Sequence, residues 1–125
     1  MADLTIDEVV KRAFRIARDH GFWDVPRALR MAELPEMAIP EKLALIHSEV
    51  SEALEEYRIV GEDEAALRAI TERADGKPIG FAQELGDIVI RVADLCGRLG
   101  IDLEEVLRVK MAYNEKRPHM HGKVC

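Results

Sequence analysis

Apolar residues recur every three or four positions in four stretches of the chain, a pattern that predicts amphipathic α-helices. Two of these stretches open with the spacing of a capping box, in Thr5 with Glu8 and in Asp102 with Glu105. Glycine or proline marks the other helix ends. The predicted helices run from Thr5 to Gly21, from Pro40 to Gly61, from Phe81 to Gly100 and from Asp102 to Lys116.

The segments between these helices lack a long periodic pattern. The connection from Phe22 to Ile39 contains two prolines. Residues 62–80 are polar and are interpreted as an insert, with a short helix expected within Asp63–Ala74 and a turn in the sequence DGKPIG that follows. Pro118 cannot continue the last helix, so residues 117–125 are expected to form a C-terminal tail. No strand-like alternation of useful length is evident.

Length and helix pattern together predict the architecture. At 125 residues the chain has the size of one domain, and we interpret residues 1–125 as a single domain. The expected fold class is all-α, in the form of a four-helix-type bundle completed by homo-oligomerisation. Ile90 lies opposite the apolar arc of its helix, where a subunit contact would leave an exposed apolar side chain.

Charge and cysteine content narrow the class of partner. The formal net charge of -6 argues against a nucleic-acid polymer, because clustered Lys and Arg hold phosphate backbones. Cys96 and Cys125 lack metal-ligand spacing and, without a secretory signal, are interpreted as free thiols of a cytoplasmic protein. No apolar run approaches the roughly 18 residues that a membrane span requires. We therefore expect neither nucleic acid nor a membrane as a partner.

Two acidic pairs with i, i+3 spacing flank the apolar faces of consecutive long helices: Glu49 with Glu52, and Glu84 with Asp87. Packing along those faces would bring four carboxylates into one cleft, where they repel one another unless a cation such as Mg²⁺ neutralises them. The residues alone leave two interpretations open, a metal site and solvated acids on charge-rich helices. The apolar arcs comprise Leu43, Ile46, Val50, Ala53, Leu54 and Tyr57 in one helix, and Phe81, Leu85, Ile88, Val89, Val92, Leu95, Cys96 and Leu99 in the other.

These acidic motifs resemble a known family. E-x-x-E followed by E-x-x-D is matched by the sequences EVSE from Glu49 and ELGD from Glu84, and the ending K-x-x-x-N-x-x-R-P is matched from Lys110, with HG after it. Over residues 40–123, apart from the insert, the chain is similar to the all-α nucleoside triphosphate pyrophosphohydrolases of the MazG-like group. That group is related to dimeric dUTPases and to phosphoribosyl-ATP pyrophosphatase.

The resemblance implies a fold that assembles as a dimer or a dimer of dimers around the acidic cleft. It also implies an enzyme that cleaves a nucleoside triphosphate, NTP or dNTP, between the α- and β-phosphates to give a monophosphate and pyrophosphate. The alternatives are a relative restricted to dUTP, dCTP or a modified-base dNTP, and a catalytically silent helical interaction scaffold. The Mg²⁺ ligands implied by the resemblance, with Mn²⁺ as an expected substitute, are Glu49, Glu52, Glu84 and Asp87.

The catalytic residues expected beside the metal are Glu49, Glu52 and Glu56. Many members of the family have a further acid directly before the first motif glutamate, and Ser48 occupies that place here. Glu56, one turn beyond Glu52, is therefore the candidate for positioning the attacking water. Metal ions would lower the pKa of that water and neutralise charge on the leaving pyrophosphate.

Substrate contacts are expected from both ends of the chain. Three of them share one face at the last helix, and two follow in the tail. They are Lys110, Asn114 and Arg117, and then His121 and Lys123. The alternative for these cations is a structural role near a helix C-terminus. Near the other end, Trp23 is a candidate either to stack on a base or to cap the core, and Phe22 is expected in the core.

Overall fold

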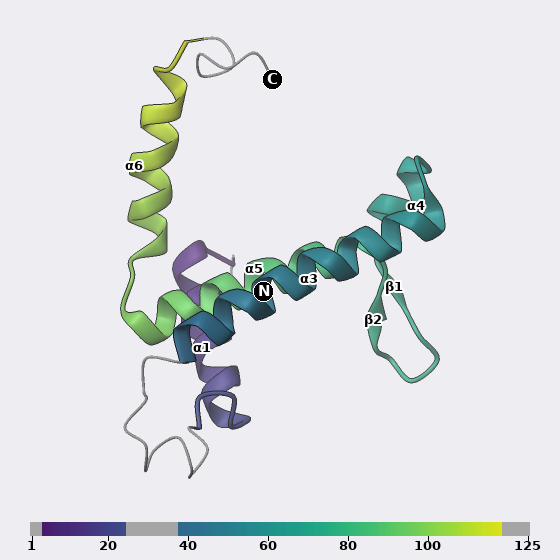
Figure 1. Cartoon of the computed structure of the whole chain (residues 1–125), viewed down its shortest axis with the longest axis horizontal. Helices are drawn as coiled ribbons and strands as arrows, with labels where there is room; N and C mark the ends of the chain where they lie inside the picture. Colours follow the sequence, from purple (N-terminus) through teal and green to yellow (C-terminus); the bar gives the residue numbers. More distant parts are fainter. Residues whose placement is uncertain (1–3, 25–37, 119–125) are drawn as a thin grey trace.

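The computed structural model describes residues 4–24 and 38–118, and helices dominate these two ranges (Figure 1). The predicted all-α class is therefore confirmed for the described residues. The helices are α1 (Ile6–Asp19), α3 (Ala38–Val60), α4 (Glu64–Arg68), α5 (Phe81–Leu99) and α6 (Leu103–Glu115). No helix in these ranges is both long and apolar enough to cross a membrane.

The predicted helix caps are present. Thr5 Oγ1 accepts a hydrogen bond from the backbone N–H of Glu8 at 3.1 Å, and Asp102 Oδ1 accepts one from Glu105 at 3.1 Å. These bonds satisfy backbone donors that the first turn of a helix leaves without partners. Gly100 ends α5 in the left-handed conformation, with φ of 70°, which glycine adopts at little cost.

The insert between α3 and α5 differs from the prediction. Its helix, α4, has only five residues, and a short antiparallel hairpin of β1 (Thr71–Glu72) and β2 (Pro78–Ile79) follows it. The short helix expected within Asp63–Ala74 is therefore confirmed, whereas the two-residue strands of the hairpin were not predicted. Gly76, with φ of 86°, turns the chain between the strands, and the backbone N–H of Arg73 donates to the carbonyl of Lys77 at 2.8 Å.

The three long helices α1, α3 and α5 form the packed part of the molecule. α3 and α5 lie side by side, α1 packs across α5, and α6 extends away from them (Figure 1). The α1–α5 contact is close, because a Cβ added at Gly97 would come within 2.5 Å of Phe14 Cβ. α6 has no buried residue, and its main packing is a light contact with α1.

Small side chains form most of the core. No large side chain among the described residues is fully buried, and the buried apolar residues are Ala13, Ala53, Ala93, Leu95 and Cys96. The predicted core face of α3 is confirmed at Ala53 but not at Val50 and Leu54, which are 50% and 48% exposed, while Glu49 is only 7% exposed. Helix α3 turns Glu49 and Ala53 toward α5, and several of its large apolar side chains, Val50 and Leu54 among them, face outward.

Candidate functional site

Three glutamates from two helices meet where α3 packs on α5. Glu49 and Glu52 come from α3 and Glu84 from the first turn of α5, and one carboxylate oxygen of each lies within 4.8 Å of the others. Glu49 is buried, Glu84 is half-buried and Glu52 is exposed, so the group opens to solvent on one side. Three of the four predicted metal ligands are thus brought together.

A single cation balances the buried member of this group. Arg91, on α5, donates from Nε to Glu49 Oε1 at 2.6 Å, and the two side chains are 34% and 9% exposed. The ion pair satisfies one oxygen of a carboxylate that burial would otherwise destabilise. Sequence reasoning missed Arg91, although a cation one helical turn after Asp87 was a usable signal.

The remaining charge in the cluster is poorly compensated. Glu84 Oε2 is buried and accepts no hydrogen bond. Partial burial raises the pKa of the Glu84 carboxyl to about 7, and the nearby carboxyl of Glu52 adds to the shift. An acceptor without a donor beside two further carboxylates fits the ligand set of a hard divalent cation.

The fourth predicted ligand, Asp87, lies outside the group of three. Partial burial raises the pKa of its carboxyl, the charge of Glu49 adds to the rise, and the charge of Arg91 opposes it. Asp87 and Glu49 both line a cavity of about 300 Å³ between α1, α3 and α5. The carboxylates therefore lie at the edge of a space large enough for part of a small molecule.

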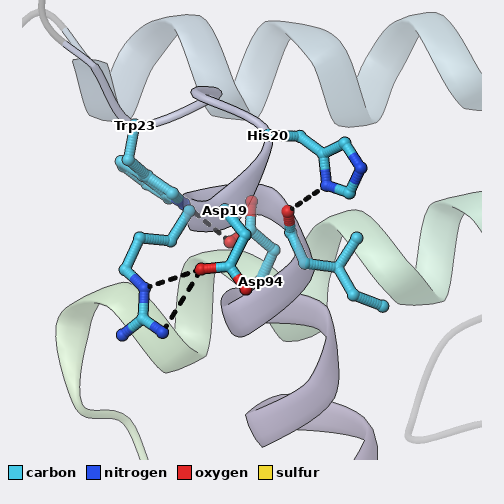
Figure 2. A network of polar contacts seen from close by, with 6 residues as sticks. Asp19, His20, Trp23 and Asp94 are labelled. Carbon is cyan, nitrogen blue, oxygen red and sulfur yellow. Dashed lines mark hydrogen bonds and ion pairs between the residues drawn. The ribbon is translucent and has the colours of Figure 1, made fainter.

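Asp94, Lys42 and Phe22 also line this cavity, and Figure 2 shows the contact of Asp94 with Trp23. Trp23 Nε1 donates to Asp94 Oδ1 at 2.7 Å, and Lys42 Nζ lies 4.6 Å from the centre of the indole ring. Lys42 also donates to the carbonyl oxygen of Phe22 at 2.6 Å. Phe22 lines the cavity and is 59% exposed, so its prediction as a core residue was wrong.

Trp23 packs at the edge of the α1–α5 contact, and its two suggested roles stay predictions. It is half-buried, its ring faces Lys42 and Arg98, and Phe14 packs against it in an edge-to-face contact at 6.5 Å. Phe22 and Asp94, rather than Trp23, are among the residues that line the cavity. The signal for Asp94 was its position on α5, seven residues after Asp87 and hence on the same face.

The predicted substrate contacts on α6 lie apart from the carboxylates within one chain (Figure 1). Lys110 and Arg117 both approach the ring of Tyr113, at 5.7 and 5.6 Å from its centre. Asn114 Oδ1 is buried and accepts no hydrogen bond. His121 and Lys123 fall outside the described residues.

Glu56, the candidate for positioning water, is half-buried on α3 and does not belong to the group of three glutamates. Its assignment stays a prediction. Comparison with protein-family models, with curated proteins and with solved structures found no match. The case for a function rests on the residues and their geometry.

Proposed function

We propose that this protein is a Mg²⁺-dependent nucleoside triphosphate pyrophosphohydrolase, which releases a nucleoside monophosphate and pyrophosphate. The observation that carries the proposal is the group of three glutamate oxygens within 4.8 Å of one another at the edge of a cavity. A divalent cation there would neutralise the carboxylates and offer its remaining coordination positions to phosphate oxygens. The sequence resemblance in EVSE and ELGD supports the same assignment.

In this proposal Glu49, Glu52 and Glu84 hold the metal, and Asp87, which lines the same cavity as Glu49, would join them when substrate binds. Mn²⁺ is expected to substitute. When the metal binds the carboxylate of Glu49, Arg91 would lose its ion pair with Glu49. Its guanidinium would then be available to bind a phosphate oxygen. The site thereby supplies positioning and charge neutralisation, which are the main requirements of phosphoryl transfer.

The proposal includes a homodimer or a dimer of dimers. Large apolar side chains on α3 and α6 remain about half exposed, among them Val50, Leu54, Val106 and Val109. In each helix two of these side chains are three or four positions apart and share a face, as expected for a helix that packs on another protein surface. Because α6 lies apart from its own chain's carboxylates, Lys110, Asn114 and Arg117 would reach substrate only from a second copy.

The decisive experiment is product analysis. The protein is incubated with Mg²⁺ and each common NTP and dNTP, and the products are separated by ion exchange. We expect monophosphate and pyrophosphate, reduced about 100-fold or more in Glu52→Gln, on the scale seen when one charge-stabilising group is removed. Glu55→Gln is the matched control, because Glu55 is an exposed glutamate of the same helix that pairs with Arg58 instead.

The other outcomes are equally informative. Diphosphate and phosphate as products would overturn the assignment of the cleaved bond. Without turnover, thermal melting separates the remaining possibilities, because a ligand that binds only the folded state raises its stability. Stabilisation by Mg²⁺ that is lost in Glu84→Gln would indicate a metal site with a narrow substrate. No stabilisation would indicate a silent interaction scaffold.

A further inference from the structure

The cavity beside the carboxylates has two chemically different ends. Glu49, Asp87 and Arg91 line one end, and Asp94, Lys42 and Phe22 line the other. Along α5 the residues Asp87 and Asp94 are seven positions apart, which is about 10.5 Å of helix rise on one face. That separation suits a ligand with a phosphate at one end and a ring at the other.

The walls between these ends are apolar. Ala13, Ile16 and Ala17 of α1 and Ile90 of α5 line the same space. Small and aliphatic side chains leave room for a flat ring and offer it no competing hydrogen bonds. Phe22 adds an aromatic ring at the rim, where it is available for stacking because it is 59% exposed.

Asp94 gives the far end a defined hydrogen-bonding preference. Its Oδ1 accepts from Trp23 Nε1 at 2.7 Å, which fixes the orientation of the carboxylate (Figure 2). Oδ2 is the oxygen left to accept from a ligand, and an ionised carboxylate has no proton to donate. An amino group satisfies this oxygen. The N3–H of uracil or thymine is a poorer match, because carbonyl oxygens flank it on both sides and the carboxylate repels them.

We propose that this cavity binds the nucleobase of the substrate, and that Asp94 selects bases carrying an exocyclic amino group over uracil and thymine. The inference rests on the proposed function for its phosphate end, and it adds a base-selecting residue that the acidic motifs do not include. Lys42, which lies over the ring of Trp23 and lines the same cavity, supplies the complementary donor for a ring nitrogen or carbonyl of the same base.

The test compares dCTP with dUTP, which differ at one ring position, an amino group against a carbonyl. We expect wild-type kcat/KM to favour dCTP at least about 10-fold, since an unpaired polar group in such a site lowers affinity for the wrong ligand. Asp94→Asn keeps an oxygen for Trp23 and places an amide donor where Oδ2 was. It should reverse the preference. Asp19→Asn is the matched control, because Asp19 is a neighbouring acid that pairs with Arg18 at the surface.

A second readout does not depend on hydrolysis. Trp23 is the one tryptophan of the chain, and it is hydrogen-bonded to Asp94, so its fluorescence reports on binding of dCMP and dUMP without metal. The expected result is tighter binding of dCMP in the wild type and of dUMP in Asp94→Asn. Phe22→Ala should weaken both nucleotides several-fold and leave their ratio unchanged, and this exposed position carries little risk to the fold.

The outcomes separate the two proposals. Pyrophosphate release with equal dCTP and dUTP rates, or with a preference that Asp94→Asn does not change, would overturn the base assignment and leave the proposed function standing. Absence of pyrophosphate release together with Asp94-dependent binding of dCMP would overturn the proposed function and support the base cavity. If neither monophosphate changes the Trp23 fluorescence and Phe22→Ala has no effect on turnover, the cavity does not bind a base.

Discussion

The proposed site has carboxylates on the paired helices α3 and α5 and cations on the separate helix α6. The two sets of charged side chains differ in how firmly packing fixes them. On α3 and α5 the carboxylates are fixed by packing, with Glu49 buried and bonded to Arg91. On α6 the cations Lys110 and Arg117 lie over Tyr113, on a helix without a buried residue. One chain therefore builds the acidic half of the site, and the position of the cationic half depends on what α6 packs against.

The largest effect is expected from a charge placed on the apolar face of α6. Val109 is 60% exposed, so Val109→Asp should change the stability of an isolated chain by no more than about 0.5 kcal/mol. In a closed interface the same charge would cost about 3–5 kcal/mol, which weakens association at least about 100-fold. Sedimentation would show dissociation, and turnover at low protein concentration would fall with it.

Val109→Ile should preserve both assembly and turnover, because it keeps an apolar side chain at this position. A wild-type protein that is monomeric and fully active would contradict the expectation that α6 packs against a second copy of the chain.

Substitution of Arg91 tests the charge balance between the packed helices α3 and α5. Arg91→Gln leaves buried Glu49 without its cation, and we expect a loss of about 1–3 kcal/mol in the free energy of unfolding measured with EDTA. Mg²⁺ should restore more stability to this variant than to the wild type, because the metal replaces the missing charge.

Arg108→Gln on α6 is the matched control. Its partners Glu104 and Glu105 lie at the surface, so its loss should cost less than about 0.5 kcal/mol. Equal losses for the two arginine variants would show that the packed and exposed ion pairs do not differ.

Two glycines of α5 differ in how closely another helix approaches them, and alanine substitutions would measure this difference. Gly97→Ala would force a Cβ against Phe14 of α1 and should destabilise the chain by about 1–3 kcal/mol. Gly86→Ala meets no atom within 4 Å and should stabilise it by about 0.4–1 kcal/mol, because alanine lowers the entropy of the unfolded chain. Chemical denaturation of both variants gives the two values. Effects of the same sign would contradict the close α1–α5 contact.

A further prediction is a pH dependence from Glu84. Its pKa is raised from 4.5 to about 7, so the folded state binds this proton more tightly than the unfolded chain does. The resulting stabilisation is complete below pH 4.5 and is lost as the pH rises through 7. With EDTA, Glu84→Gln should flatten this part of the stability curve, whereas Glu55→Gln should not. Mg²⁺ affinity should rise over the same pH range, because the metal displaces the proton.

Local signals in the sequence predicted the helices but not which faces meet. The caps at Thr5 and Asp102 depend on neighbouring residues only, and both were predicted correctly. The buried face of α3 was predicted only in part, because periodicity identifies residues that share a face without saying which of two faces packs within the chain. Glu49 and Ala53 pack inward, and Val50 faces outward.

The same distinction applies to the site. E-x-x-E and E-x-x-D spacing identified three glutamates that the structure brings together, because helix geometry places i and i+3 side by side. Arg91 and Asp94 were missed because their partners, Glu49 and Trp23, are 42 and 71 positions away in the chain. Contacts at such separation follow from the packing of α5 against α1 and α3, which no local pattern encodes.

The small side chains at the helix contacts bear on the choice of ion. Ala53 follows Glu49 by one turn, is 5% exposed, and sets how closely α3 approaches α5. The distance between the two helices in turn sets how far Glu84 lies from the two glutamates of α3. Mg²⁺ requires oxygens at about 2.0–2.1 Å, and Ca²⁺ takes them at about 2.3–2.6 Å. A larger residue at position 53 would separate the helices and favour the larger cation, so in the proposed metal site the preference for Mg²⁺ would depend on the size of one methyl group.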